Sequence, residues 1–296
     1  MTRITTERMI GVLGKASKPK IVWQRQFDHD DETLHRLARC DWDAVPDADL
    51  WCYIHDLTYV ELQPDLFRHL FPACLKFWYS TLLRNEGAER GDADFHRALL
   101  RGEILTRMMT DQERQRTLQF FVDGFLDRIE LERGFDYVRP GWSANAWIGR
   151  FNTLGLVAPI IRTIWRSWWA FDSPGKAVSA IKYASGLVYL QGENPIYLPW
   201  TPREGGGGPY LTEWDASIFD HVWLAQNLSF LRETLTCDYV VEQLSIAARQ
   251  LRGEPEETMA QLISDDAPRR RDVISLRIEN LVANLARETA KKDRWD

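Results

Sequence analysis

One group of residues that could perform acid–base chemistry lies around a loop rich in glycine and proline, residues 192–221. Glu193, Asp215 and His221 belong to this stretch, and carboxylates and imidazoles commonly act as general acids and bases. Proximity in the sequence is what brings the three together. A hydrolase with its active site at this loop is therefore one of two functions that the sequence leaves open.

Other catalytic and ligand-binding patterns are missing from the sequence. His55 stands in an otherwise apolar helix, which is typical of a histidine at the edge of a core rather than of a ligand. Ser173 and Lys176 have S-x-x-K spacing but lack the companion motifs. The four cysteines show no C-x-x-C pair or zinc spacing, and no H-E-x-x-H motif is present. The sequence therefore favours a protein without catalytic residues, metal or cofactor.

Four consecutive glycines, Gly205–Gly208, raise the question of a phosphate-binding loop. A P-loop requires Lys and then Ser or Thr directly after its glycines, and neither follows here. Pro209 also removes one of the backbone N–H groups that would hold a phosphate. The sequence instead predicts a flexible connection into a helix with Thr212 as its N-cap. Long loops of this kind tend to carry function.

The charge distribution favours a protein partner with a basic surface. The net charge of −6 argues against direct binding of nucleic acid, because such binding requires a basic face. Residues 1–26 are basic, whereas residues 28–65 contain eleven Asp or Glu against two basic residues, a local net charge of −9. Aromatic residues are interleaved with these carboxylates, as suits a protein interface. A solvated acidic helix face with N-caps is the alternative interpretation.

Two segments are candidates for contact with such a partner. In the acidic segment the candidates are carboxylates and tryptophans, namely Asp41, Trp42, Asp43, Asp47, Asp49 and Trp51. In the glycine-rich loop they are the charged and aromatic residues on either side of the glycines, namely Arg203, Glu204, Glu213, Trp214 and Asp215.

Neither a signal peptide nor a membrane helix is predicted. The first 20 residues have no apolar segment of signal-peptide quality. The apolar stretch of residues 155–171 is interrupted by Pro159, Arg162 and Arg166, so it does not suit a membrane span. We therefore expect a cytoplasmic protein with reduced cysteines and no membrane partner.

The elements that must position these residues are predicted to be helices. Apolar residues recur at helical spacing along most of the chain, and strand-like alternation is almost absent. Asp47 and Ser173 are predicted N-caps, Pro72 is predicted in a first helical turn, and Gly134 is predicted to close a long helix. The predicted fold is all-α, an irregular multi-helix bundle of about ten helices with one long Gly/Pro-rich loop.

Three parts are predicted along the chain. A basic N-terminal segment (1–26) precedes an N-terminal helical part (27–138) and a C-terminal helical part (139–296). The boundary follows from the sequence GFDYVRPGW, which interrupts the helical pattern with glycine, proline and aromatic residues. The two helical parts could equally pack around one core.

Residues 41–83 resemble a small bacterial domain of unknown function that is found near toxin loci. The shared pattern has a W-D-x-[IV]-P start, a polar-aromatic helix, an L-F-x-[HY]-[LY]-[FL]-P turn and an amphipathic helix. The matching residues are Trp42, Asp43, Val45, Pro46, Phe67, His69, Leu70, Phe71 and Pro72. The resemblance implies an immunity protein that neutralises an interbacterial toxin, such as a type VI secretion effector, and it transfers no catalytic residues. The predicted function is therefore a non-enzymatic binding protein that occludes a cognate toxin with a basic surface, for example a nuclease.

Overall fold

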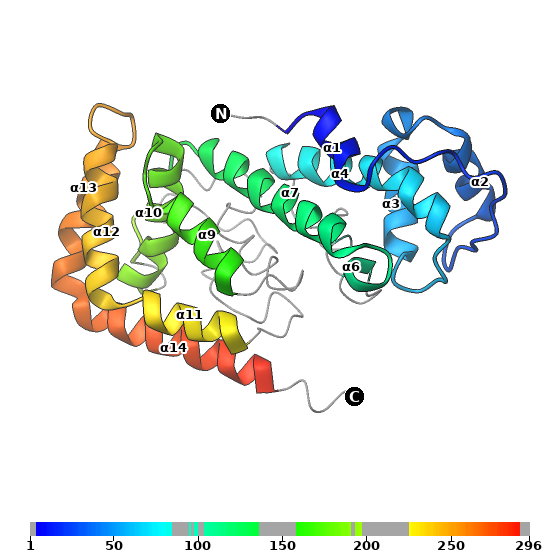
Figure 1. Cartoon of the computed structure of the whole chain (residues 1–296). Coiled ribbons are helices and arrows are strands. Elements are labelled where there is room, and N and C mark those ends of the chain that lie inside the picture. Colours follow the sequence, from blue (N-terminus) through cyan, green and yellow to red (C-terminus); the bar gives the residue numbers. More distant parts are fainter. Residues whose placement is uncertain are drawn as a thin grey trace, which may run out of the picture. The chain divides into compact units, whose positions relative to one another are not determined.

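The helical fold predicted from the sequence is confirmed by the structure. A computed structural model of the chain describes residues 4–84, 95, 98–99, 104–135, 158–190, 193–196 and 225–290. Within these ranges the regular structure is helical and no strand is present (Figure 1). None of the described helices is both long and apolar enough to cross a membrane.

The chain divides into two compact units, residues 1–127 and 128–296. Unit 1 contains α1 (Thr6–Leu13), α2 (Asp31–Arg39), the 3-10 turn η1 (Trp42–Ala44), α3 (Asp47–Asp56), α4 (Pro64–Arg84), α6 (Ile104–Arg107) and most of α7 (Asp111–Glu130). Unit 2 contains α9 (Ala158–Trp168), α10 (Pro174–Val188), α11 (Ala225–Thr234), α12 (Cys237–Gln250), α13 (Glu257–Asp266), the 3-10 turn η5 (Ala267–Arg270) and α14 (Arg271–Ala290). The boundary predicted between residues 138 and 139 lies further along the chain, outside the described residues. The basic segment 1–26 belongs to unit 1, where α1 packs against α4.

Aromatic side chains of α4 and α7 form the core of unit 1. The indole of Trp78 is fully buried and meets the ring of Phe121 edge to face, with centroids 4.6 Å apart. Gly124 lets α7 approach this indole, because a Cβ at that position would lie 2.7 Å from the ring. Buried rings of this size contribute much of a core's apolar area. The sequence has 13 tryptophans, and burial in the core explains one of them, Trp78.

Helix α4 begins earlier than the sequence predicted. Pro64 occupies its start, and Pro72 lies inside the helix rather than in a first turn, so that prediction was wrong. The residues between the two prolines include Leu66 and Phe67, which are fully buried. Their packing outweighs the backbone hydrogen bond that an internal proline removes.

The other predicted helix ends gave mixed results. Ser173 caps α10 as predicted, and its hydroxyl accepts the backbone N–H three residues on at 3.4 Å. Asp47 is the first residue of α3 and not its N-cap, because Pro46 occupies the cap position. Gly134 was predicted to close the long helix, but α7 already ends at Glu130, so this prediction was wrong; Gly134 has a positive φ of 65° in the segment after the helix.

Helix α7 starts at a capping box that also holds a salt bridge. The Thr110 N–H donates to Glu113 Oε2 at 2.8 Å, and the Glu113 N–H donates to Thr110 Oγ1 at 3.3 Å. Arg68 on α4 donates to both oxygens of the same carboxylate, at 2.7 and 3.1 Å. These bonds, with Arg68 the largest influence, lower the pKa of Glu113 from 4.5 to about 2. The carboxylate thereby ties the start of α7 to α4.

Unit 1 should therefore lose stability in acid in a way that depends on Glu113. Because the folded pKa is depressed, the carboxylate contributes its full stabilisation above pH 4.5 and loses it as the pH falls toward about 2. Urea unfolding of the wild type and of Glu113→Gln at pH 7, 4 and 2 measures this. We expect the stability difference between them to be largest at pH 7 and to shrink toward pH 2. A difference independent of pH would contradict the assigned role.

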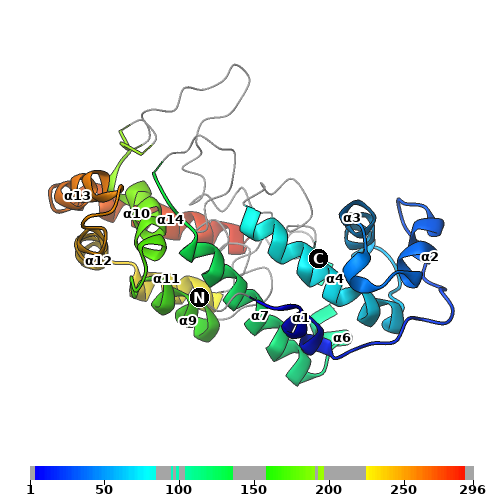
Figure 2. The same ribbon diagram turned by 90° about the horizontal axis from the view of Figure 1, so that it is seen from above.

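In unit 2, α10 is the central helix. Every residue from Gly175 to Val188 is buried, and α12, α13 and α14 pack around the helix (Figure 2). The rings of Trp165 and Trp168 on α9 contact the ring of Tyr183 on α10 edge to face, with centroid distances of 5.7 and 5.3 Å. The tryptophans that the structure describes in unit 2, Trp165, Trp168 and Trp169, are thus also core residues.

The core of unit 2 also contains a charged trio. Lys182 Nζ on α10 lies 2.9 Å from Glu132 Oε2, and Arg128 Nη2 lies 2.7 Å from Glu132 Oε1. Each side chain is at least nine-tenths buried. One buried carboxylate is therefore shared by two buried cations.

Candidate functional site

A non-helical segment of unit 1, residues 21–28, is held by side-chain hydrogen bonds; residues 22–26 have no turn or bend, and we call the whole the extended segment. At its first half, Gln63 Oε1 accepts the N–H groups of Trp23 (2.8 Å) and Gln24 (3.3 Å), and Gln63 Nε2 donates to the carbonyl of Ile21 (2.7 Å). Alternate side chains of an extended segment point to opposite sides. Gln24 is accordingly buried, whereas Ile21 and Trp23 are exposed.

The second half of this segment is held by Asp56, a fully buried carboxylate at the end of α3. Asp56 Oδ2 accepts the N–H groups of Phe27 at 2.9 Å and Asp28 at 3.3 Å. Its other oxygen, Oδ1, lies 3.1 Å from Nδ1 of His55. One carboxylate thus fixes both the backbone at residues 27–28 and the imidazole of its neighbour.

A continuous row of rings runs along this junction, and we call it the aromatic row: Phe27, Tyr59, His55, Trp51 and His29. Consecutive centroids are 5.2 Å apart for Phe27 and Tyr59, 5.9 Å for Tyr59 and His55, 5.6 Å for His55 and Trp51, and 5.8 Å for Trp51 and His29. Residues four apart on a helix share one face, which aligns the three members that come from α3 and the turn after it. The other two come from the extended segment and the residues that follow it.

Two members of the aromatic row, Phe27 and Tyr59, expose apolar surface to solvent. Among the described residues of unit 1, the exposed large apolar side chains are Ile21 (74% exposed), Trp23 (48%), Phe27 (64%) and Tyr59 (50%). Exposed carboxylates follow directly in the chain, at Asp28, Asp30 and Glu32. Exposed aromatic patches rimmed by polar residues mark interaction sites. This surface is therefore the strongest candidate site in the described part of unit 1.

Three of the four carboxylates predicted for partner contact in the acidic segment have partners within the chain. The ion pairs are Asp41 with Lys18 (2.8 Å), Asp49 with Arg36 (2.8 Å) and Asp47 with Arg84 (3.8 Å). The Lys18 ammonium lowers the pKa of the Asp41 carboxyl. Arg36 is already counted in the local net charge of −9, whereas Lys18, from the basic N-terminal segment, and Arg84 are additional cations that pair with carboxylates of this segment.

The remaining predicted residues are placed differently. Trp51 belongs to the aromatic row, whereas Trp42 lies half-buried in η1 and Asp43 is exposed beside it. The five predicted loop residues, Arg203, Glu204, Glu213, Trp214 and Asp215, lie outside the described residues, as does the proposed N-cap Thr212.

Of the acid–base trio suggested for a hydrolase, the structure describes Glu193 alone; Asp215 and His221 lie outside the described residues. The Glu193 carboxylate forms an ion pair with Arg270, with Oε2 2.7 Å from Nη1. Its hydrogen bond raises the pKa of the Arg270 guanidinium. This pairing favours a surface salt bridge over a role in proton transfer.

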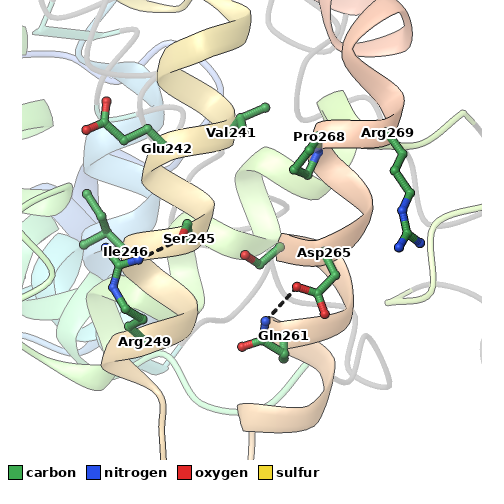
Figure 3. A pocket seen from close by; sticks show the side chains of 10 residues that line it. Val241, Glu242, Ser245, Ile246, Arg249, Gln261, Asp265, Pro268 and Arg269 are labelled. Atoms are coloured by element: carbon green, nitrogen blue, oxygen red, sulfur yellow. Dashed lines mark hydrogen bonds between the residues drawn. The ribbon is translucent and has the colours of Figure 1, made fainter.

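In unit 2, a surface groove of about 490 Å³ lies between α12 and α13 (Figure 3). The polar groups along it largely bond to one another: Arg249 Nη1 donates to Ser245 Oγ, and Gln261 Nε2 donates to Asp265 Oδ1, both at 2.8 Å. Figure 3 shows these two bonds lying within their own helices, on opposite walls of the groove. Because each pair links residues of a single helix, the groove has the character of ordinary helix surface.

Comparisons with protein-family models, curated proteins and solved structures found no match to this chain.

Three members of the aromatic row, Phe27, His29 and Tyr59, were not among the residues singled out from the sequence. The spacing of Trp51, His55 and Tyr59 was a usable signal, since it places three rings on one helical face. The contribution of the extended segment had no such signal, because it depends on hydrogen bonds to residues about 30 to 40 positions away.

Proposed function

We propose that this chain is a non-enzymatic binding protein that uses the aromatic row to cover a basic surface of a partner protein. The observation that carries the proposal is the row itself: rings in mutual contact, exposed at one end and bordered by exposed carboxylates. Aromatic side chains supply most of the binding energy at interfaces at little entropic cost, because they have few rotatable bonds.

The partner we propose is a cognate toxin, with this chain as its immunity protein. The resemblance over residues 41–83 supports this, and Trp51 lies both in that stretch and in the aromatic row. A toxin that cleaves nucleic acid needs a basic face to hold phosphates. An inhibitor that places carboxylates and rings on that face would block the substrate by direct occlusion.

The charge part of this proposal predicts a change in association rate. Carboxylates at the rim of an interface steer encounter, and their effect is weakened by salt. Neutralising Asp28 and Glu32 together, as Asp28→Asn with Glu32→Gln, should slow association with the cognate toxin proposed above. We expect the slowing to be several-fold at low salt and to be largely lost at high salt.

Stopped-flow or surface-plasmon kinetics at two salt concentrations would measure this effect. The matched control is Asp265→Asn with Glu257→Gln, which removes the same charge from α13 in unit 2 and should leave association unchanged. Equal slowing by both pairs would show a net-charge effect and would contradict a local docking surface.

A further inference from the structure

Two histidines and a buried carboxylate come together at the inner end of the aromatic row. His29, His55 and Asp56 each offer one metal-ligand atom, and these three atoms lie within 4.8 Å of one another. His29 comes from the loop before α2, and the other two come from the last turn of α3. The cluster therefore joins two segments that are distant in the sequence.

One nitrogen of His29 is available to a ligand. His29 Nε2 is shielded from solvent and has no hydrogen-bond partner among the described residues. A buried polar atom without a partner costs free energy, and such atoms are rare in native proteins unless something else binds them. The lone pair of an imidazole nitrogen is also the commonest protein ligand for transition metals.

The rest of the donor set is held in position before any ion binds. Two backbone N–H groups engage Asp56 Oδ2, which leaves Oδ1 directed toward His55, 3.1 Å from its Nδ1. Asp28 Oδ2 lies 4.0 Å from the same imidazole nitrogen, on the exposed side of the cluster. Hydrogen bonds that fix a ligating carboxylate are typical of metal sites. Asp28 or water could complete a fourth position.

We propose that His29, His55 and Asp56 form a binding site for a divalent transition-metal ion of the zinc class. Two imidazoles with a carboxylate are a donor set that suits zinc and its neighbours and does not suit calcium or magnesium, which prefer oxygen alone. Tetrahedral ligands about 2.1 Å from an ion are roughly 3.4 Å apart, so small side-chain rotations would close the cluster around it.

A bound ion would connect the loop at residues 27–29 to the end of α3. His29 and His55 are both members of the aromatic row, so the ion would fix the orientation of the rings beside them. The site rests on the geometry of unit 1 alone and does not depend on the identity of a partner.

The test is a titration of the full chain, freed of metal with a chelator, with zinc chloride in a calorimeter. We expect one ion per chain for the wild type. His29→Gln and His55→Gln should each weaken this binding at least about tenfold, because each removes a ligand. His35→Gln is the matched control: its imidazole is exposed on α2, outside the cluster. Cys52→Ser tests whether the Cys52 thiol, also on α3, binds the zinc ion in place of one of the two histidines.

Titration with cobalt chloride provides a second measurement. A cobalt(II) ion with four ligands absorbs visible light more strongly than the hexaaqua cobalt(II) ion in solution. We expect the wild type and the two control variants to give the same enhanced band, and the two cluster variants to lose it. The proposal is overturned if the wild type binds less than one equivalent of zinc, or if His29→Gln and His55→Gln bind it as tightly as the wild type. Binding that is abolished by Cys52→Ser and unaffected by the two cluster variants would also overturn it. Circular dichroism of each variant establishes that it is folded.

Discussion

Replacing Gly175 with alanine is expected to lower the free energy of unfolding of unit 2 by about 3 kcal/mol or more. Gly175 stands in the first turn of α10, where the helix passes directly over the end of α7. An added Cβ would lie 2.2 Å from the carbonyl oxygen of Glu130 and 2.6 Å from its carbonyl carbon. These are backbone atoms that cannot rotate away, so the start of the central helix must move.

Hydrogen exchange of the α10 amides would measure this loss, since it reports on unit 2 separately in a chain whose two units need not unfold together. Gly11→Ala is the control, because nothing lies within 4 Å of the Cβ position at Gly11 in α1. That change should be neutral or stabilise α1 by up to about 1 kcal/mol. Similar protection of α10 in the wild type and in Gly175→Ala would contradict the close approach of the two backbones.

Removing the charge of Glu132 should destabilise unit 2 by about 3–5 kcal/mol. Its carboxylate is the shared partner of Arg128 and Lys182, and all three side chains are buried. Glu132→Gln would remove the negative charge that these two buried cations share. Taking a charge out of water is unfavourable unless an opposite charge lies beside it.

A triple variant separates two causes of the lost stability: the removal of the shared negative charge and the altered packing of the side chain at position 132. Arg128→Met, Glu132→Gln and Lys182→Met together remove both cations along with the anion, so most of the stability lost in Glu132→Gln should return. Exchange protection of α10 is again the measurement. A triple variant as unstable as the single one would mean that packing, not charge, determines the effect.

The helices could be predicted from the sequence where caps and apolar periodicity agreed. α10 is an example, since Ser173 and Pro174 mark its start and its cap is the predicted one. α13 was not predicted, and the structure shows why: its N-cap, Glu256, makes no side-chain capping bond, so the usual start signal is missing. The start of α4 was misplaced because burial of its first turns, not the position of Pro72, decides where the helix begins.

The candidate site was predictable only in part. Trp51 stood out because it lies among carboxylates, but several of those carboxylates pair with cations from elsewhere in unit 1. Local charge counts cannot reveal such pairing, since Lys18 and Arg84 are far from their partners in the sequence. The cluster of His29, His55 and Asp56 was not predicted from the sequence for the same reason: His29 is distant from the other two residues in the sequence, and only the folded chain brings them together.

The central claim, that this chain binds and blocks a toxin, is tested most directly by mixing it with purified candidate toxins, taken from the products of the genes beside its own, and measuring complex formation and toxin activity together. We predict a stable complex and loss of the toxin's activity at equimolar inhibitor. Phe27→Ala with Tyr59→Ala, which removes the exposed end of the aromatic row, should shorten the lifetime of the complex at least tenfold and restore activity. Leu262→Ala with Leu276→Ala, which removes exposed apolar side chains from unit 2, should do neither. A toxin that remains fully active with the wild-type chain in micromolar excess, and forms no complex with it, would contradict the claim.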